Sequence, residues 1–145
     1  ASERTAMAKP TGSTNKLLQT GRTYIRQHRF EEAVKVYQQA ADQSPRNALV
    51  QRELGWALLN LADVSYSKQA DYHQEAVGAF RKAVQLNPRY AEAYHLMGVA
   101  YMNLGQKRDA ASNFRTALQN GLKGDDATEA REFLRRLEEE GVPPN

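Results

Sequence analysis

One spacing pattern recurs three times along this chain, and it constrains the fold more than any other feature of the sequence. Each copy begins with a glycine and continues, further along, with an aromatic residue and then an alanine three positions later. The copies contain Gly21, Tyr37 and Ala40, then Gly55, Phe80 and Ala83, then Gly98, Phe114 and Ala117. An internal repeat of this length predicts that one helical hairpin is built repeatedly and stacked into a solenoid, whose concave surface favours binding over catalysis.

Aligning the copies divides the chain into units of residues 14–47, 48–90 and 91–124. A proline closes each of the first two units, at Pro45 and Pro88. With these residues the chain resembles the tetratricopeptide repeat family, whose 34-residue unit carries the same small, aromatic and proline positions. The resemblance implies an all-α fold, a right-handed superhelix (solenoid) of three helical hairpins.

Three positions depart from the family's pattern. Thr20 stands where a leucine is usual, Gln51 stands where a large apolar residue is usual, and Leu122 stands where the third closing proline is usual. None of these is expected to break the core, because the glycine, aromatic and alanine positions are kept in all three units.

The two ends of the chain differ from the repeats. Residues 1–13 lack periodicity and predict a flexible leader. Residues 125–145 predict a C-terminal capping helix and tail, starting at Asp125 or Asp126 and ending at Gly141. The apolar stripe of this helix would cover the exposed face of the last hairpin. Three consecutive glutamates, residues 138–140, either solvate the cap or contact a basic partner.

The second unit is longer than the other two. It has 43 residues where the family has 34, and the extra stretch is roughly residues 62–72. Its helices are predicted from Val50 to about Leu61 and from about His73 to Leu86. Because the extra stretch lacks glycine and proline, the alternative is that the first helix runs on past Leu61, with a turn at about residues 69–71. Such an insertion is either an interaction element or a tolerated difference in length, and Tyr66 and Tyr72 favour an interface.

In tetratricopeptide proteins the first helix of each hairpin lines a concave groove. Carried over to this chain, that surface would contain Asn15, Leu18, Gln19, Arg22, Arg26, Arg52, Glu53, Trp56, Leu59, Asn60, His95, Leu96, Val99, Met102 and Asn103. Trp56, the only tryptophan, and Met102 would be apolar anchors for a bound peptide. The arginines would select acidic flanks, although Trp56 as a core residue and the arginines as solvated charges are alternatives.

Some family members clamp the C-terminal carboxylates of chaperones with basic and amide side chains. At the matching positions this chain has Leu18, Arg22, Glu53, Glu92 and Leu96, of which only Arg22 suits a carboxylate. A chaperone C-terminal tail is therefore expected to be an unlikely partner.

Other functional classes find little support in the sequence. There is no cysteine, no phosphate-binding glycine loop and no paired-histidine zinc motif, so we expect no enzyme activity, no metal site and no cofactor. His28 and His73 are predicted to lie on the surface. Lysines and arginines are scattered, which argues against nucleic acid as a partner, and no apolar run reaches the length of a membrane span.

The sequence thus predicts a protein–protein interaction adaptor that binds a peptide or helix of a partner in its groove. The alternative is a structural assembly subunit or homo-oligomer that uses the convex face or the 62–72 insertion. A cytoplasmic location is favoured, with a periplasmic or exported one as the alternative if a leader was removed.

Overall fold

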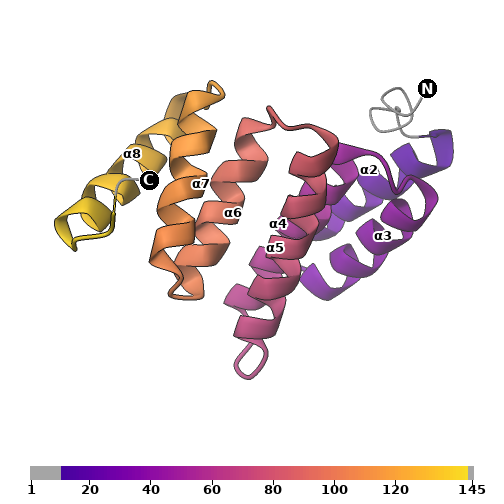
Figure 1. The fold of residues 1–145 in the computed structure, drawn as a ribbon. Helices are drawn as coiled ribbons and strands as arrows, with labels where there is room; N and C mark the ends of the chain where they lie inside the picture. The colour runs from indigo at the N-terminus through magenta and orange to yellow at the C-terminus, as the bar shows by residue number, and fades with distance from the viewer. Residues whose placement is uncertain (1–10, 144–145) are drawn as a thin grey trace.

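The computed structural model describes residues 11–143, and this part of the chain forms seven α-helices and no strand. The helices are α2 (Gly12–Arg26), α3 (Phe30–Gln43), α4 (Ala48–Asp63), α5 (Gln69–Leu86), α6 (Ala91–Asn103), α7 (Lys107–Gln119) and α8 (Gly124–Glu139). Consecutive helices pair as hairpins α2–α3, α4–α5 and α6–α7, and α8 packs beside α7 at the end of the row (Figure 1). The predicted all-α solenoid of three hairpins with a C-terminal capping helix is confirmed.

The repeated glycines and aromatics meet inside each hairpin. A Cβ atom built on Gly21 would lie 2.3 Å from the Tyr37 ring, one on Gly55 2.5 Å from Phe80, and one on Gly98 2.7 Å from Phe114. No side chain fits at such distances, so glycine is what lets the two helices of a hairpin approach this closely. The spacing pattern in the sequence therefore encodes the central contact of every hairpin.

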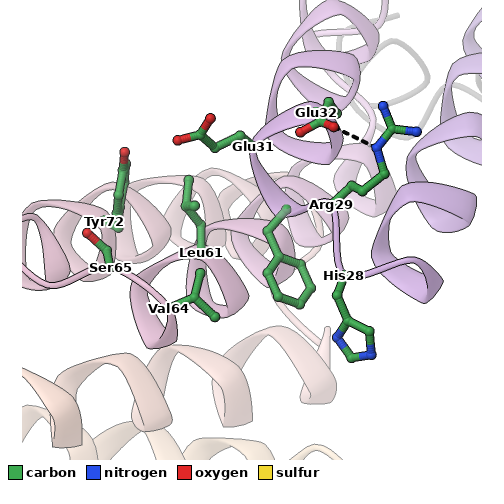
Figure 2. A pocket seen from close by; sticks show the side chains of 9 residues that line it. His28, Arg29, Glu31, Glu32, Leu61, Val64, Ser65 and Tyr72 are labelled. Atoms are coloured by element: carbon green, nitrogen blue, oxygen red, sulfur yellow. Dashed lines mark hydrogen bonds and ion pairs between the residues drawn. The ribbon is translucent and has the colours of Figure 1, made fainter.

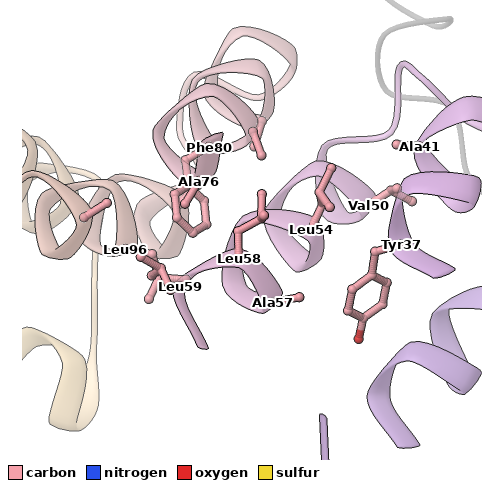
Figure 3. Packing of buried hydrophobic residues seen from close by; sticks show 14 of the residues in the cluster. Tyr37, Ala41, Val50, Leu54, Ala57, Leu58, Leu59, Ala76, Phe80 and Leu96 are labelled. Carbon is pink, nitrogen blue, oxygen red and sulfur yellow. The ribbon is translucent and has the colours of Figure 1, made fainter. Parts of the chain in front are cut away.

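The core follows the row of hairpins in two clusters. The first cluster joins α2 to α6 and includes Tyr37, Leu54 and Phe80 (Figure 3). The second joins the third hairpin to α8, where Leu134 and Leu137 pack with Phe114. The Phe114 and Phe133 rings stack at 5.2 Å between centroids. The terminal helix thus buries the apolar face that the last hairpin would otherwise expose.

The helix starts and turns show local chemistry that the spacing pattern does not predict. The first helix begins at Gly12, capped by the Thr11 hydroxyl, which accepts from the Thr14 amide at 3.1 Å. Gly12 and Ser13 are therefore helical rather than part of the predicted leader, and the rest of that leader, residues 1–10, lies outside the described residues. His28, between α2 and α3, has φ of 58°, a left-handed conformation that Gly105 adopts between α6 and α7.

The insertion in the second unit lengthens both of its helices. The chain runs on as helix to Asp63 and resumes helix at Gln69, so the turn occupies residues 64–68 rather than the predicted 69–71. The segment lacks glycine and proline, and Ala62 is fully buried, so the helix continues for as long as its apolar face meets the core. The α4–α5 hairpin consequently extends past its neighbours at one end (Figure 1).

The capping helix also begins slightly earlier than predicted. It starts at Gly124, after Lys123, and no side chain caps its first turn. Gly141, with φ of 87°, follows its last residues, as the sequence predicted. Within residues 11–143, no helix has the length and apolar character needed to cross a membrane.

Candidate concave binding surface

The first helices of the hairpins, α2, α4 and α6, present the residues predicted for the groove, but to very different degrees. Asn15, Gln19, Arg22, Arg26, Trp56 and Asn103 are exposed, and Arg52, Asn60, Val99 and Met102 are half-buried. Leu18, Glu53, Leu59, His95 and Leu96 are buried. The accessible part of the predicted groove is therefore concentrated on α2 and α4, and we call the surface formed by Arg22, Arg52, Glu53 and Trp56 the first-helix face.

Trp56 is the large apolar side chain of this face. It is 37% exposed, in a chain whose other large aromatic repeat residues, Tyr37, Phe80 and Phe114, are completely buried. Residues three and four positions apart share one side of a helix, so Arg52, Glu53 and Asn60 lie around Trp56 on α4. The Asn60 side-chain amide donates to the Trp56 carbonyl at 2.8 Å.

Two arginines share one buried carboxylate beside Trp56. An Oε1 atom of Glu53, a residue only 7% exposed, lies 3.5 Å from Arg22 Nη2 on α2 and 3.4 Å from Arg52 Nη1. The contact with Arg22 connects the first hairpin to the second. Buried Arg52 Nε finds no acceptor among the described residues. One carboxylate cannot satisfy the donors of two guanidinium groups, so the cluster keeps hydrogen-bonding capacity for an anionic ligand.

Two tyrosines extend this cluster below the surface. Burial, reinforced by the Glu53 carboxylate, raises the pKa of Tyr37 well above its ordinary value. Burial likewise raises the pKa of Tyr90, whose neighbours include Arg52 and Glu92. Both phenols are therefore neutral hydroxyls at physiological pH, and the buried Tyr37 hydroxyl lies close to the Glu53 carboxylate.

The third unit contributes less to this face than predicted, because α8 covers it. The predicted groove residue His95 is buried, and its Nε2 lies 3.0 Å from Glu129 Oε1 on α8. Val99 and Met102 pack toward the cluster formed with α8, so Met102 is not a free apolar anchor. The assignment of His95 to the groove is wrong, because α8 packs on a surface that the sequence pattern predicts to be exposed.

Leu18, Leu59 and Leu96 are likewise corrected from groove to core. All three belong to the cluster that joins the first hairpin to the third. Burial of a leucine side chain against the neighbouring hairpin is favourable because it removes apolar surface from water. These three leucines are therefore core residues and are not available to a ligand.

A hollow lies at the end of the molecule where the inserted hairpin projects (Figure 2). It has a volume of about 480 Å³ and lies between the α2–α3 turn and the α4–α5 hairpin. Half-buried Tyr72 packs against the core there, whereas Tyr66, at the tip of the insertion, is fully exposed. The two tyrosines that the sequence singled out therefore have different environments.

His73, next to this region, is a further correction. It was predicted to lie on the surface at a helix start, but α5 begins a turn earlier, at Gln69, and His73 is buried. Burial lowers the pKa of His73, and its Nδ1 lacks a partner among the described residues. His28 is exposed as predicted. Within residues 11–143 no group of histidine, aspartate or glutamate side chains could hold a metal ion.

Sequence reasoning missed the buried parts of this site. Nothing in the repeat pattern indicated that Glu53 would connect two arginines from different helices, or that the Tyr37 hydroxyl would lie near it. The available signal was the pair of opposite charges Arg52 and Glu53 at first-helix positions, where the pattern predicts surface.

The chain belongs to the tetratricopeptide repeat family. A family model described as TPR repeat matches residues 21–62 and 72–105, more than half of the chain, and one described as Tetratricopeptide repeat matches residues 91–120. The first match leaves out most of the insertion at 62–72.

Solved structures of tetratricopeptide domains have the same fold. The Sgt2 domain from Aspergillus fumigatus superposes with a TM-score of 0.78 at 19% identity, covering 94% of this chain and 86% of that one. The first domain of Spaghetti (RPAP3), bound to the HSP90 peptide SRMEEVD, gives 0.74 at 23% identity, covering 90% and 94%. The TPR2B domain of yeast Sti1, in a complex with Hsp70, gives 0.77 at 18% identity, covering 90% and 99%.

These neighbours correct one expectation from the sequence. A chaperone tail was judged an unlikely partner because Glu53 and Glu92 stand at the family's carboxylate-binding positions. Domains of similar fold nevertheless bind HSP90 and HSP70 peptides, so a chaperone tail is not excluded as a partner.

Curated relatives match over much of this chain but little of their own length. The peroxisomal targeting signal receptor of Candida glabrata is 29% identical over 89 residues, 61% of this chain and 14% of the receptor. Tetratricopeptide repeat protein 28 of Mus musculus is 32% identical over 94 residues, 65% of this chain and 4% of that protein. The chain spans less than a fifth of the length of these relatives.

Proposed function

We propose that this chain is a protein-interaction adaptor that captures an acidic, apolar-containing peptide of a partner on its first-helix face. The observation that carries the proposal is exposed Trp56 on α4, one helical turn from Arg52 and from Glu53, whose carboxylate is shared by Arg22 and Arg52. An aromatic side chain with arginines around it is the composition typical of binding hot spots. The indole would cover an apolar side chain of the peptide, while Arg22 and Arg52 would bind its carboxylate.

Comparison with related proteins supports a peptide as the ligand. Several neighbours of similar fold hold short peptides that end in acidic residues, as SRMEEVD does. These neighbours are under 25% identical to the chain, so the similarity shows the fold alone. An acidic peptide as the ligand of this chain is our own proposal.

A titration with SRMEEVD, and with the same peptide carrying glutamine and asparagine in place of its acids, tests this proposal. We expect the acidic peptide to bind more tightly, and Trp56→Ala to weaken it by about 2–4 kcal/mol, as truncation of a central anchor does. Arg22→Gln should mainly slow association, because exposed charges act on the encounter rate. Exposed Arg46, in the α3–α4 turn, provides the control Arg46→Gln. Equal binding of both peptides, or full binding by Trp56→Ala, would contradict the proposal.

The inserted hairpin supports a second candidate function, assembly with another subunit. Tyr66 is fully exposed at its tip and Val64 beside it is 60% exposed, so an apolar pair projects into solvent.

Tyr66→Ala should leave the unfolding midpoint unchanged and weaken self-association or subunit binding, measured by sedimentation. Tyr72→Ala should instead lower stability by about 1–3 kcal/mol, since Tyr72 packs on the core. Unchanged sedimentation of Tyr66→Ala would assign no assembly role to the tip.

A further inference from the structure

A groove on the opposite side of the molecule, between the second helices α3 and α5, carries features that the chain's own packing does not explain. It has a volume of about 610 Å³. We call it the α3/α5 groove; its lining residues fall into a floor on α4, a wall on α3 and a wall on α5, and include Gln51, Leu54, Leu58, Asp42, Glu75 and Gly78. Figure 3 shows Leu54 and Leu58 on α4 between Ala76 and Phe80 of α5 on one side and Ala41 of α3 on the other.

Gln51 is the first of these features. The family pattern has a large apolar residue here, and the equivalent position of the third unit is Tyr94, 43 residues further on. Tyr94 packs against both core clusters, and its hydroxyl donates to the Pro88 carbonyl at 2.9 Å. Gln51 is shorter, so it leaves open a space that an aromatic ring fills in the next unit.

The Gln51 side chain also lines this groove. The residue is 4% exposed, and within residues 11–143 its side-chain amide makes no hydrogen bond. An amide presents one donor group and one acceptor side by side, which is the complement of a peptide group in an extended backbone.

Gly78 is the second feature. It lies in the middle of α5, where glycine is less favourable than alanine, yet a Cβ built on it would meet no atom within 4 Å. The repeated glycines Gly21, Gly55 and Gly98 are required by the ring packed on each, but nothing in the chain requires Gly78. A glycine in a groove wall allows the backbone of a ligand to approach closely.

The charges at the rim indicate the ligand's chemistry. The walls carry the carboxylates of Asp42 and Glu75 against the single ammonium of Lys82, so the rim is acidic in a chain of net charge +3. Asp42 accepts from the Gln38 amide at 3.2 Å and keeps further acceptor capacity. A ligand with a lysine or arginine next to an apolar side chain would match this acidic rim and the apolar floor.

We propose that the α3/α5 groove is a second peptide site, which binds an extended segment of a partner protein carrying an apolar side chain next to a lysine or arginine. The apolar side chain lies on Leu54 and Leu58, the backbone passes Gly78 and pairs with the Gln51 amide, and the basic group reaches Asp42 and Glu75. The site is separate from the first-helix face. It prefers basic ligands, whereas the first-helix face prefers acidic ones.

A phage-displayed library of random nine-residue peptides, panned on the full chain, tests this proposal. The blocking variant is Gln51→Tyr, which copies the chain's own solution at Tyr94 and places a hydroxyl near Pro45, the counterpart of Pro88. A second blocking variant, Gly78→Leu, adds a side chain where space is open and favours the helix. Trp56→Ala is the control, because it removes the anchor of the other face.

We expect the enriched peptides to pair an apolar residue with lysine or arginine, and to lose about tenfold or more in affinity on either blocking variant while binding Trp56→Ala normally. The Gln51 side-chain amide signals in an NMR spectrum of the wild-type chain should shift when such a peptide is added. If every enriched peptide binds both blocking variants fully, or is lost only on Trp56→Ala, the proposal is overturned.

Two other occupants of the α3/α5 groove, the chain's own N-terminal residues and a second copy of the chain, would give distinct results and would also overturn the proposal. If removal of residues 1–10 is what opens the groove to the peptides, the N-terminal residues fill it in the intact chain. If the wild-type chain is dimeric in sedimentation and Gln51→Tyr is monomeric, a second copy of the chain is the occupant.

Discussion

Gly98 and Gly78 both lie inside helices, but only Gly98 is enclosed. A Cβ on Gly98 would be 2.7 Å from the Phe114 ring, whereas one on Gly78 meets nothing within 4 Å. Gly98→Leu should therefore lower the free energy of unfolding by about 1–3 kcal/mol or more, through overpacking. Gly78→Ala, the matched control, should raise it by up to about 1 kcal/mol, since alanine favours the helix. Urea unfolding of both variants measures the difference, and an unchanged midpoint for Gly98→Leu would contradict the packing described.

His73 makes stability depend on pH in a direction that follows from its burial. Burial lowers its pKa from the ordinary 6.5, partly offset by the nearby Asp63 carboxylate. The unfolded chain therefore binds a proton more readily than the folded one, and the stability that His73 contributes is lost as the pH falls below about 6.5. His73→Gln should flatten the dependence of the melting temperature on pH between about 7.5 and 5.5. Parallel curves for the variant and the wild type would show that the pKa of His73 is the same in the folded and the unfolded chain.

At the scale of the element, the sequence predicted the hairpins well and their ends less well. Glycine, aromatic and alanine positions identify which helices pair because close packing requires those residue types at those places. The turn of the second hairpin was misplaced because no local signal marks it: the helix continues until Asp63, as long as residues such as Ala62 find the core. Thr11 and Ser13 have the residue types of a helix start, but the repeat pattern begins after them.

The capping helix shows why part of the site could not be predicted. Positions such as His95 are groove positions only if nothing packs on them, and that depends on where α8 lies. The apolar stripe of α8 was evident in the sequence, but its angle across α6 and α7 results from packing between distant segments. Trp56 and Arg22, remote from α8, have the exposure that the pattern predicted.

The role of α8 can be tested without shortening the chain. Leu137 is 1% exposed, so Leu137→Asp would bury an unpaired charge against the last hairpin and detach the helix. We expect a lower unfolding midpoint, binding of an apolar dye and aggregation, because the Phe114 face becomes exposed. Glu138→Asp, at the adjacent exposed position, is the control and should change none of these. A monomeric Leu137→Asp variant with the wild-type midpoint would show that α8 does not stabilise the third hairpin.

At the scale of the whole molecule, the row of hairpins creates two surfaces with different chemistry. The first-helix face has an exposed indole and two arginines, and the α3/α5 groove has an acidic rim above an apolar floor. A solenoid has room for such a division because each helix pair contacts only its neighbours and leaves both sides of the row accessible. Binding on one face should therefore leave the other open, consistent with an adaptor that holds two segments at once.

The emission of Trp56 tests the central claim, that the first-helix face binds a partner's peptide. As the only tryptophan, and 37% exposed, it should emit in the free chain as an indole in contact with water. On saturation with SRMEEVD the emission should shift to the blue, because the peptide removes water from the ring, and Arg22→Gln should require more peptide for the same shift. An emission spectrum that already reports a buried indole, or that stays unchanged while the peptide is bound, would contradict the account.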